Sequence, residues 1–259
     1  MSKLTILSSG AGGSDYLTQE ALKALDEAQV VVSYTKYAKE LKEYIKDKEL
    51  YTSGMTHEIQ RCQMAIDYAK SGKNTCIISN GDVNVFGMAT LIVELIDEQN
   101  LWDSIELDSI AGVTSFLAAA SRVGAPVSQD FAVISLSDRL TDIKLIDKRV
   151  YNALDGDFII GIYNPKSKKR IQPYINLLDR LKEFDNKIVI IASNVGREAK
   201  EKITITDTNE LIAQGIEHPD ITMSTLLIIC NSTTRLTSNG MVLTPRGYLN
   251  KYDMDGNLK

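Results

Sequence analysis

In the first half of the chain, short apolar runs alternate with segments whose apolar residues recur at helical spacing. The apolar runs, which predict buried strands, lie at residues 4–7, 30–32 and 75–79. Helical spacing predicts helices at residues 18–28, 58–69 and 88–95. Alternation of this kind is typical of a mostly parallel sheet that is covered by helices.

The second half of the chain has a different pattern. Strands with helices between them are expected at residues 132–136, 158–163 and 187–191. Three further strands, with less helix around them, are expected at residues 202–206, 225–229 and 241–243. The loss of intervening helices predicts a mixed sheet with antiparallel members.

Glycine and proline interrupt a polar run at residues 124–130, which is the best candidate for a linker. We therefore expect an α/β protein of two domains with helices on both sheet faces and the active site in the cleft between the domains. The N-terminal domain would span residues 1–123 with a mostly parallel sheet, and the C-terminal domain residues 131–249 with a mixed sheet. Residues 250–259 form a short polar tail, which we expect to be poorly ordered.

Composition and charge narrow the class of protein. The 259 residues are 44% hydrophobic and 24% charged, as in globular proteins, and the net charge of −5 lacks the basic excess of a nucleic-acid binder. No apolar run reaches the ~18 residues of a membrane span, and the first residues do not resemble a signal peptide. The three cysteines are far apart and there are only two histidines, so we expect neither a disulfide scaffold nor a metal site. These features predict a cytoplasmic protein that binds no nucleic acid and no membrane.

Glycines and polar residues gather where five of the predicted strands end. The first end, residues 8–13, has Asp15 where a dinucleotide-binding motif needs its third glycine, and the chain has no P-loop motif. A tight strand-to-helix turn is the simpler interpretation of that end. The other four ends are residues 79–87, 110–115, 163–165 and 193–198. Because ligands of open α/β sheets bind at the carboxyl ends of strands, the five ends together favour a binding cleft.

Two of these ends leave alternative roles open. Asp82 could accept hydrogen bonds from ribose hydroxyls or from an ammonium group, or it could cap the helix that follows. The basic run at residues 166–170 could be a solvated loop, or it could dock carboxylates or phosphates. No motif for a serine or cysteine nucleophile is present.

Taken in order, the strand ends resemble those of the tetrapyrrole methylases. Residues 10–12, 17–18, 53–56, 80–82 and 86–88 resemble the N-terminal half of that family. One branch, the ring-contracting precorrin-3B or cobalt-factor III methyltransferases that act at carbon 17 in cobalamin synthesis, is similar at residues 124–126, 130–138 and 163–167. Residues 196–198, 231–232 and 244–248 agree, so the resemblance covers nearly the whole chain. Three positions depart from the family, with Ser8 where a glycine is usual and Ala11 and Ala111 where prolines are usual.

The resemblance implies a two-domain α/β homodimer that binds S-adenosylmethionine and releases S-adenosyl-L-homocysteine. The substrate it implies is a tetrapyrrole, precorrin-3B or cobalt-factor III, and no resident metal ion is implied. Carried across residue by residue, the contacts with the cofactor fall on strand ends: Gly81, Asp82, Val85, Thr114, Ser115, Asn164, Asn194 and Thr225.

The implied chemistry depends on positioning, because a sulfonium methyl group is already activated. Ring contraction adds proton transfers that call for an acid or base. The candidates are Ser137, Asp138 and Glu198, with Arg197 as an electrostatic partner. Ser137 and Asp138 could instead cap the following helix, and Glu198 could pair with Arg197 on the surface. The carboxylates of the substrate need local positive charge, for which the candidates are Lys166, Lys168, Arg122, Arg139 and Arg246.

Three alternative functions remain open. A sibling methylase that acts at carbon 11 would share fold and cofactor, but residues 130–138 and 163–167 argue against it. A methylase of the same fold acting on RNA or protein is disfavoured because the chain has no basic excess. A non-catalytic sensor would bind S-adenosylhomocysteine and a partner protein without converting a tetrapyrrole.

Overall fold

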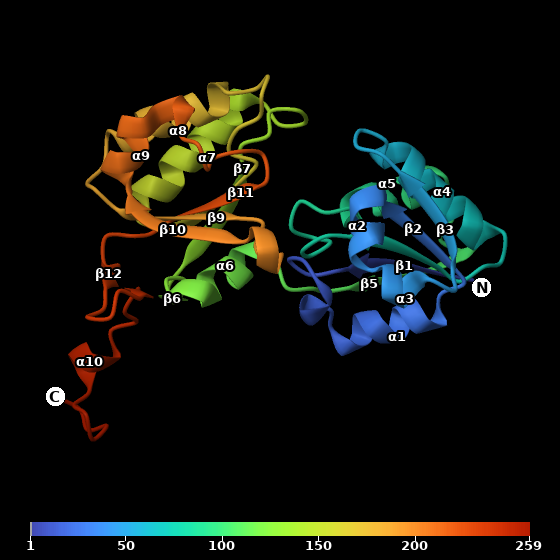
Figure 1. The fold of residues 1–259 in the computed structure, drawn as a ribbon, viewed down its shortest axis with the longest axis horizontal. Helices are drawn as coiled ribbons and strands as arrows, with labels where there is room; N and C mark the ends of the chain where they lie inside the picture. The colour runs from blue at the N-terminus through green and yellow to red at the C-terminus, as the bar shows by residue number, and fades with distance from the viewer. Residues whose placement is uncertain (1) are drawn as a thin grey trace. The chain divides into compact units, whose positions relative to one another are not determined.

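The chain folds into two compact units, Met1–Ser115 and Phe116–Lys259 (Figure 1). The computed structural model describes residues 2–259, apart from the side chain of Glu198. The division falls earlier than the predicted domain end at residue 123, and packing explains the difference. The ring of Phe116 lies against Gly161 of the second unit, so closely that a Cβ atom at Gly161 would meet it at 2.5 Å.

The first unit contains a five-stranded sheet in which every pair of neighbours is parallel, as predicted. Its strands, in spatial order, are β3 (Glu49–Ser53), β2 (Val30–Tyr34), β4 (Thr75–Ser79), β1 (Ser2–Ser8) and β5 (Ile105–Ile110). Its helices are η1 (Ser14–Tyr16), α1 (Gln19–Glu27), α2 (Thr35–Glu40), α3 (Lys42–Ile45), α4 (Glu58–Lys70) and α5 (Ala89–Glu98).

Alternate residues of these strands face two different cores. Leu4, Ile6 and Ile77 belong to the core beneath α4 and α5. Leu7 and Ile78 point the other way, into the core beneath α1, α2 and α3. Because successive side chains of a strand point to opposite faces, a sheet buried on both faces requires the continuous apolar runs seen in the sequence.

The second unit contains a mixed sheet, as predicted. Its strands, in spatial order, are β10 (Lys202–Asp207), β9 (Ile188–Ser193), β11 (Thr225–Ile229), β8 (Ile159–Tyr163) and β7 (Phe131–Ser135). β7 and β8 are parallel, whereas β11 runs antiparallel to β8 and β9, and β10 runs antiparallel to β9. The helices α7 (Ile143–Asp155), α8 (Gln172–Leu181) and α9 (Thr208–Gln214) lie on one face and α6 (Ser115–Val123) on the other (Figure 1). Two short helices, η2 (Glu198–Lys200) and η3 (Gly215–Glu217), complete the connections.

A separate three-stranded sheet is formed by β12 (Arg235–Leu236), β13 (Val242–Leu243) and β6 (Gly124–Ala125). Two predictions were wrong here. The strand at residues 241–243 does not join the mixed sheet, and the predicted linker begins with a strand that pairs with β13. Gly124 permits this pairing because a Cβ atom there would lie 2.6 Å from the carbonyl oxygen of Val242.

The C-terminal residues contain more structure than the sequence predicts. Helix α10 (Tyr248–Lys251) leads into a turn closed by an antiparallel bridge between Tyr252 and Leu258. Asp253 caps that turn by accepting the backbone N–H groups of Asp255 and Asn257 at 3.0 and 2.8 Å. Within residues 2–259, no helix has both the length and the apolar character needed to cross a membrane.

Candidate active site

In the first unit, the carboxyl ends of β1 and β4 are joined by backbone hydrogen bonds. Both strands are parallel neighbours, so their ends lie at the same edge of the sheet. The Ser9 N–H donates to the Ser79 carbonyl at 2.8 Å, and Gly10 and Gly81 exchange two bonds of 3.1 and 2.6 Å. The predicted strand ends at residues 8–13 and 79–87 are therefore held together by backbone hydrogen bonds.

Glycine is required here for two different reasons. Gly81 has φ +70°, a conformation that side chains disfavour, and the nearest atom to a Cβ there would be Thr114 Cα at 4.0 Å. Gly112 is instead crowded, because a Cβ would lie 2.4 Å from Ser8 Cβ and 2.6 Å from the Gly81 carbonyl oxygen. The backbone conformation of Gly81 thus disfavours a side chain there, while Gly112 lets the loop after β5 pack against Gly81.

Asp82 ties the loop after β4 to the loop after β5. Its Oδ1 accepts the Asn84 N–H at 2.8 Å and its Oδ2 accepts the Gly112 N–H at 2.9 Å. Ser8 links the end of β1 to the loop after β4, since its Oγ accepts the Val83 N–H at 3.0 Å. The alternative in which Asp82 caps the next helix is wrong, because the N-cap residue of α5 is Met88.

The other predicted cofactor contacts of this unit lie in these two loops or directly after them. Val85 is half-buried and its N–H donates to the Asp82 carbonyl at 3.1 Å. Thr114, in the loop after β5, and Ser115, the first residue of α6, are also half-buried. The structure therefore brings Gly81, Asp82 and Thr114 close together, with Val85 and Ser115 beside them.

In the second unit, the predicted residues gather at one edge of the mixed sheet. β7, β8 and β9 end there, and the antiparallel β11 begins there, as the pairing of Ser135 with Tyr163 and of Thr225 with Ser193 shows. Asn164 and Asn194 directly follow β8 and β9, and both have φ +52°. Asparagine tolerates this left-handed conformation better than most residues do.

Ser135, which the sequence analysis did not select, organises the end of β7. Its Oγ accepts the side-chain amide N–H of Asn164 at 3.0 Å and the backbone N–H of Ser137 at 3.2 Å. Leu136 adds a backbone bond to the Tyr163 carbonyl at 2.9 Å. The only sequence signal for Ser135 was its place as a hydroxyl residue at the end of an apolar run.

The side chain of Thr225 is engaged in hydrogen bonds within the second unit. The residue is buried, and its hydroxyl donates to the Asp220 carbonyl at 2.7 Å while accepting the Thr222 N–H at 3.0 Å. Ser193 Oγ lies 3.0 Å away as a further partner. Because a hydroxyl has one proton to donate, the Thr225 side chain stabilises the loop and has no donor left for a cofactor.

The acid–base candidates lie in the loops at this same edge. Asp138 faces Arg170, with 3.5 Å between Oδ1 and Nη1. Neither Ser137 nor Asp138 caps α7, because its N-cap is Asp142, so that alternative is wrong. Arg197 is half-buried, and its N–H donates to the Asn194 carbonyl at 3.0 Å. Glu198 begins η2, and its side chain lies outside what the structure describes.

The predicted docking cations are not equivalent. The Lys166 ammonium group donates hydrogen bonds to two backbone carbonyls, those of Ile216 and His218. These bonds fix the loop that contains Lys166 to the backbone of residues 216–218. Arg122 pairs with Glu201 at 3.3 Å. Lys168 and Arg139 are exposed.

Arg246 lies away from this edge. Its Nη1 donates to the Ser128 carbonyl at 3.3 Å, and Ser128 precedes β7 rather than following it. A five-residue strand is about 17 Å long, so the opposite ends of β7 cannot serve one small site. Within one chain, Arg246 is therefore separated from the predicted docking residues that follow the strands.

The cysteines are chemically inert as nucleophiles. Burial raises the pKa of each thiol to about 12, in Cys62, Cys76 and Cys230. A thiol reacts as its thiolate, which is scarce near neutral pH at such a pKa. Among residues 2–197 and 199–259, no group of three or more His, Cys, Asp or Glu side chains could hold a metal ion.

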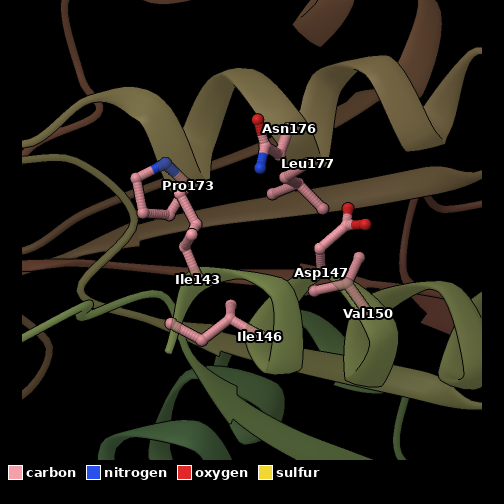
Figure 2. Close-up of a pocket in the computed structure, with 7 residues that line it drawn as sticks. All are labelled: Ile143, Ile146, Asp147, Val150, Pro173, Asn176 and Leu177. Atoms are coloured by element: carbon pink, nitrogen blue, oxygen red, sulfur yellow. The ribbon is translucent and has the colours of Figure 1, made fainter. Parts of the chain in front are cut away.

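A groove between α7 and α8 is not a candidate for the active site. It is lined mostly by apolar side chains such as Ile143, Val150 and Leu177 (Figure 2). Its empty space of ≈ 170 Å³ is smaller than the roughly 300 Å³ at which small-molecule sites begin. Asp147 at its side is held by Arg180 through bonds of 3.0 and 2.7 Å.

Comparison with known proteins identifies the family. The sequence profile of the Tetrapyrrole (Corrin/Porphyrin) Methylases matches residues 3–212, well over half of the chain. This chain belongs to the tetrapyrrole methylase family. The resemblance inferred from the strand ends is thereby confirmed.

Relatives of this tetrapyrrole methylase carry specific names. It is 38% identical over 248 residues to a Salmonella typhimurium protein named "Probable cobalt-factor III C(17)-methyltransferase", covering 95% of this chain and 99% of that one. It is 32% identical over 251 residues to the "Precorrin-3B C(17)-methyltransferase" of Sinorhizobium sp, covering 95% and 96%. The crystal structure of the methyltransferase CobJ matches with a TM-score of 0.85 at 28% identity, covering 95% of this chain and all of that one.

Proposed function

We propose that this tetrapyrrole methylase transfers a methyl group from S-adenosylmethionine to carbon 17 of cobalt-factor III, with ring contraction, in cobalamin biosynthesis. The observation that carries the proposal is the 38% identity, over nearly the full length of both chains, to a relative named for that reaction. The match to CobJ over the whole of that structure supports the same branch. Precorrin-3B is the second candidate substrate, supported by the relative at 32% identity.

The residues of the first unit fit the cofactor. Gly81 turns the backbone at the end of β4 with φ +70°, and Asp82 holds the surrounding loops in place through two N–H groups. Each carboxylate oxygen has two lone pairs, so Asp82 can still accept a bond from a ribose hydroxyl or an ammonium group. We propose Gly81, Asp82, Val85, Thr114, Ser115, Asn164 and Asn194 as cofactor-binding residues, and no longer include the side chain of Thr225.

The chain itself supplies binding and orientation. When bound, S-adenosylmethionine supplies a methyl group activated by its positive sulfur. Hydrogen bonds within each unit keep the strand ends rigid before any ligand arrives, and such preorganisation provides most of the rate in a reaction of this type. Ser137 and Glu198 remain our candidates for proton transfer during ring contraction, with Arg197 as an electrostatic partner.

The proposal includes a cytoplasmic homodimer. The C-terminal segment exposes apolar side chains, with Tyr248 69%, Leu249 61% and Met254 87% exposed. Exposed apolar groups in one segment are typical of a surface that another chain covers. Light scattering on the eluted protein should give the mass of two chains, and a chain ending at residue 247 should give the mass of one. A full-length monomer would contradict this part of the proposal.

The reaction is tested by anaerobic incubation with cobalt-factor III and S-adenosylmethionine labelled in its methyl group. We expect a product heavier by one labelled methyl and an absorption spectrum changed by ring contraction. Transfer to precorrin-3B alone would assign the metal-free substrate instead. If neither tetrapyrrole gains label while S-adenosylhomocysteine still binds, the carbon 11 sibling or the sensor becomes the better interpretation.

A matched pair of variants tests the cofactor site by calorimetry with S-adenosylhomocysteine. Asp82→Ala should weaken binding about tenfold or more, because it removes two charge-assisted hydrogen bonds, one within the loop after β4 and one to the loop after β5. Glu94→Ala removes an exposed carboxylate of α5 and should leave binding unchanged. Equal affinities of the two variants would remove Asp82 from the cofactor site.

A further inference from the structure

The loop between β8 and α8 carries four cations, which the structure places in different surroundings. Lys166 holds the loop to the backbone of residues 216–218. Lys168 and Lys169 are exposed to solvent. Arg170 is half-buried and faces the carboxylate of Asp138. In the sequence these residues form one basic run, and Arg170 is not among the predicted docking residues.

A tight turn holds the backbone of Arg170. Its N–H donates to Ser167 Oγ at 3.0 Å, and its carbonyl accepts the Ser167 N–H at 3.1 Å. This turn follows β8, and Asp138 lies in the loop that follows β7, so the two residues come from neighbouring parallel strands. Both therefore lie at the edge of the sheet where Asn164 begins its loop.

The pair of Arg170 and Asp138 is incompletely satisfied. Nη1 and Oδ1 are 3.5 Å apart, which is longer than the roughly 2.7–2.9 Å of a charge-assisted hydrogen bond. Both atoms are buried, and neither has a hydrogen-bond partner among the described residues. Buried polar atoms in folded proteins are nearly always hydrogen-bonded, so this exception calls for a role.

A guanidinium with an unused donor suits a particular ligand chemistry. Its planar fork matches the two oxygens of a carboxylate, whereas an exposed lysine offers only a mobile point charge. Asp138 already neutralises part of the charge, which keeps Arg170 in place without occupying Nη1 in a hydrogen bond.

We propose that Arg170 binds a side-chain carboxylate of the tetrapyrrole and that Asp138 is a positioning residue that orients the guanidinium for it. The inference rests on the proposed function, since it takes the tetrapyrrole as substrate. A carboxylate is also present on the methionine part of S-adenosylmethionine, so the experiment measures both ligands separately.

The test compares Arg170→Gln, Arg170→Lys, Asp138→Asn and the double variant Arg170→Gln/Asp138→Asn. Lys169→Gln serves as the matched control because it removes the adjacent, exposed charge. For each protein, KM and kcat are measured with cobalt-factor III, and Kd is measured for S-adenosylhomocysteine. Thermal unfolding checks that each variant is folded.

For Arg170→Gln we expect KM for the tetrapyrrole to rise about ten- to a hundredfold, the usual cost of losing a hydrogen-bonded charge pair. Its Kd for S-adenosylhomocysteine should stay the same, and kcat should change little. The KM of Arg170→Lys should lie between those of the wild type and Arg170→Gln, because lysine keeps the positive charge but lacks the planar pair of donors. Lys169→Gln should match the wild type.

By itself, Asp138→Asn should raise KM about threefold. In the double variant it should cause no further rise in KM beyond that of Arg170→Gln, because Asp138 acts only through Arg170. A full effect of Asp138→Asn in that background would overturn its positioning role. An unchanged KM in Arg170→Gln, or a raised Kd for S-adenosylhomocysteine, would overturn the role of Arg170. If the wild type itself methylates neither tetrapyrrole, it is the proposed function that fails.

Discussion

Replacing Gly112 with alanine should lower the free energy of unfolding of the first unit through steric crowding alone. The new Cβ would lie 2.4 Å from Ser8 Cβ and 2.6 Å from the Gly81 carbonyl oxygen. The backbone conformation of Gly112 is not left-handed, so no conformational strain is added. The Gly81 carbonyl cannot move freely, because it accepts the Gly10 N–H in the paired bonds between β1 and β4.

Overpacking a rigid site costs about 1–3 kcal/mol, and the contact with the fixed backbone at Gly81 places this case near the upper end. Gly54→Ala is the matched control. Gly54 is exposed, is not left-handed, and its Cβ would meet nothing closer than 3.9 Å. That substitution should be neutral or stabilising by about 0.5 kcal/mol, because alanine reduces the freedom of the unfolded chain.

The assay is urea unfolding followed by fluorescence. Trp102 is the only tryptophan and lies in the first unit, so its signal reports on the unit that contains Gly112. We expect Gly112→Ala to unfold about 2–3 kcal/mol more easily than Gly54→Ala. Because the shifted carbonyl belongs to Gly81, the affinity for S-adenosylhomocysteine should also fall. Equal unfolding midpoints and equal affinities for the two variants would refute this account of how the strand ends are held.

Three further predictions concern other parts of the chain. Burial lowers the pKa of His218 below its usual 6.5. The unfolded chain therefore binds a proton more readily than the folded one. As a result, the free energy of unfolding should fall as the pH drops from about 7 through the folded-state pKa, and then level off. Urea midpoints at several pH values should show this fall in the wild type and a smaller one in His218→Gln, and equal slopes would contradict it. Iodoacetamide at pH 8 should leave the three cysteines unmodified in the native protein and label all three in urea, as counted by mass spectrometry, because burial protects them and raises their pKa. Gly161→Ala should destabilise the second unit by about 1–3 kcal/mol, because the new Cβ would strike the ring of Phe116. The double variant Gly161→Ala/Phe116→Leu should recover part of this loss, because it removes the ring. Thermal unfolding of the single and double variants measures both effects.

Much of the fold could be predicted because its signals are local. A strand buried on both faces must be apolar at every position, and a surface helix must repeat its apolar residues every three to four positions, so both can be recognised within a dozen residues. The parallel first sheet, the mixed second sheet and the polar strand ends were all visible in this way. The sequence also carried enough of these ends, in order, to identify the family.

Where the glycines and prolines of the sequence predicted a different boundary from the one that tertiary packing produces, the structure follows the packing. Glycine and proline at residues 124–130 suggested a linker, yet Gly124 pairs with β13, and α6 belongs to the second unit through the ring of Phe116. Neither contact has a local signature, because the partners lie far away along the chain.

The same limit applies to the candidate site. Its residue types and strand-end positions follow from the sequence, but the partners of its polar groups do not. Asp82 reaches Gly112, Asp138 reaches Arg170, and Thr225 turns inward to the Asp220 carbonyl. A polar side chain near a strand end must satisfy its hydrogen bonds with whatever the tertiary fold places beside it, so only the folded chain decides which groups hold the loops and which remain for a ligand.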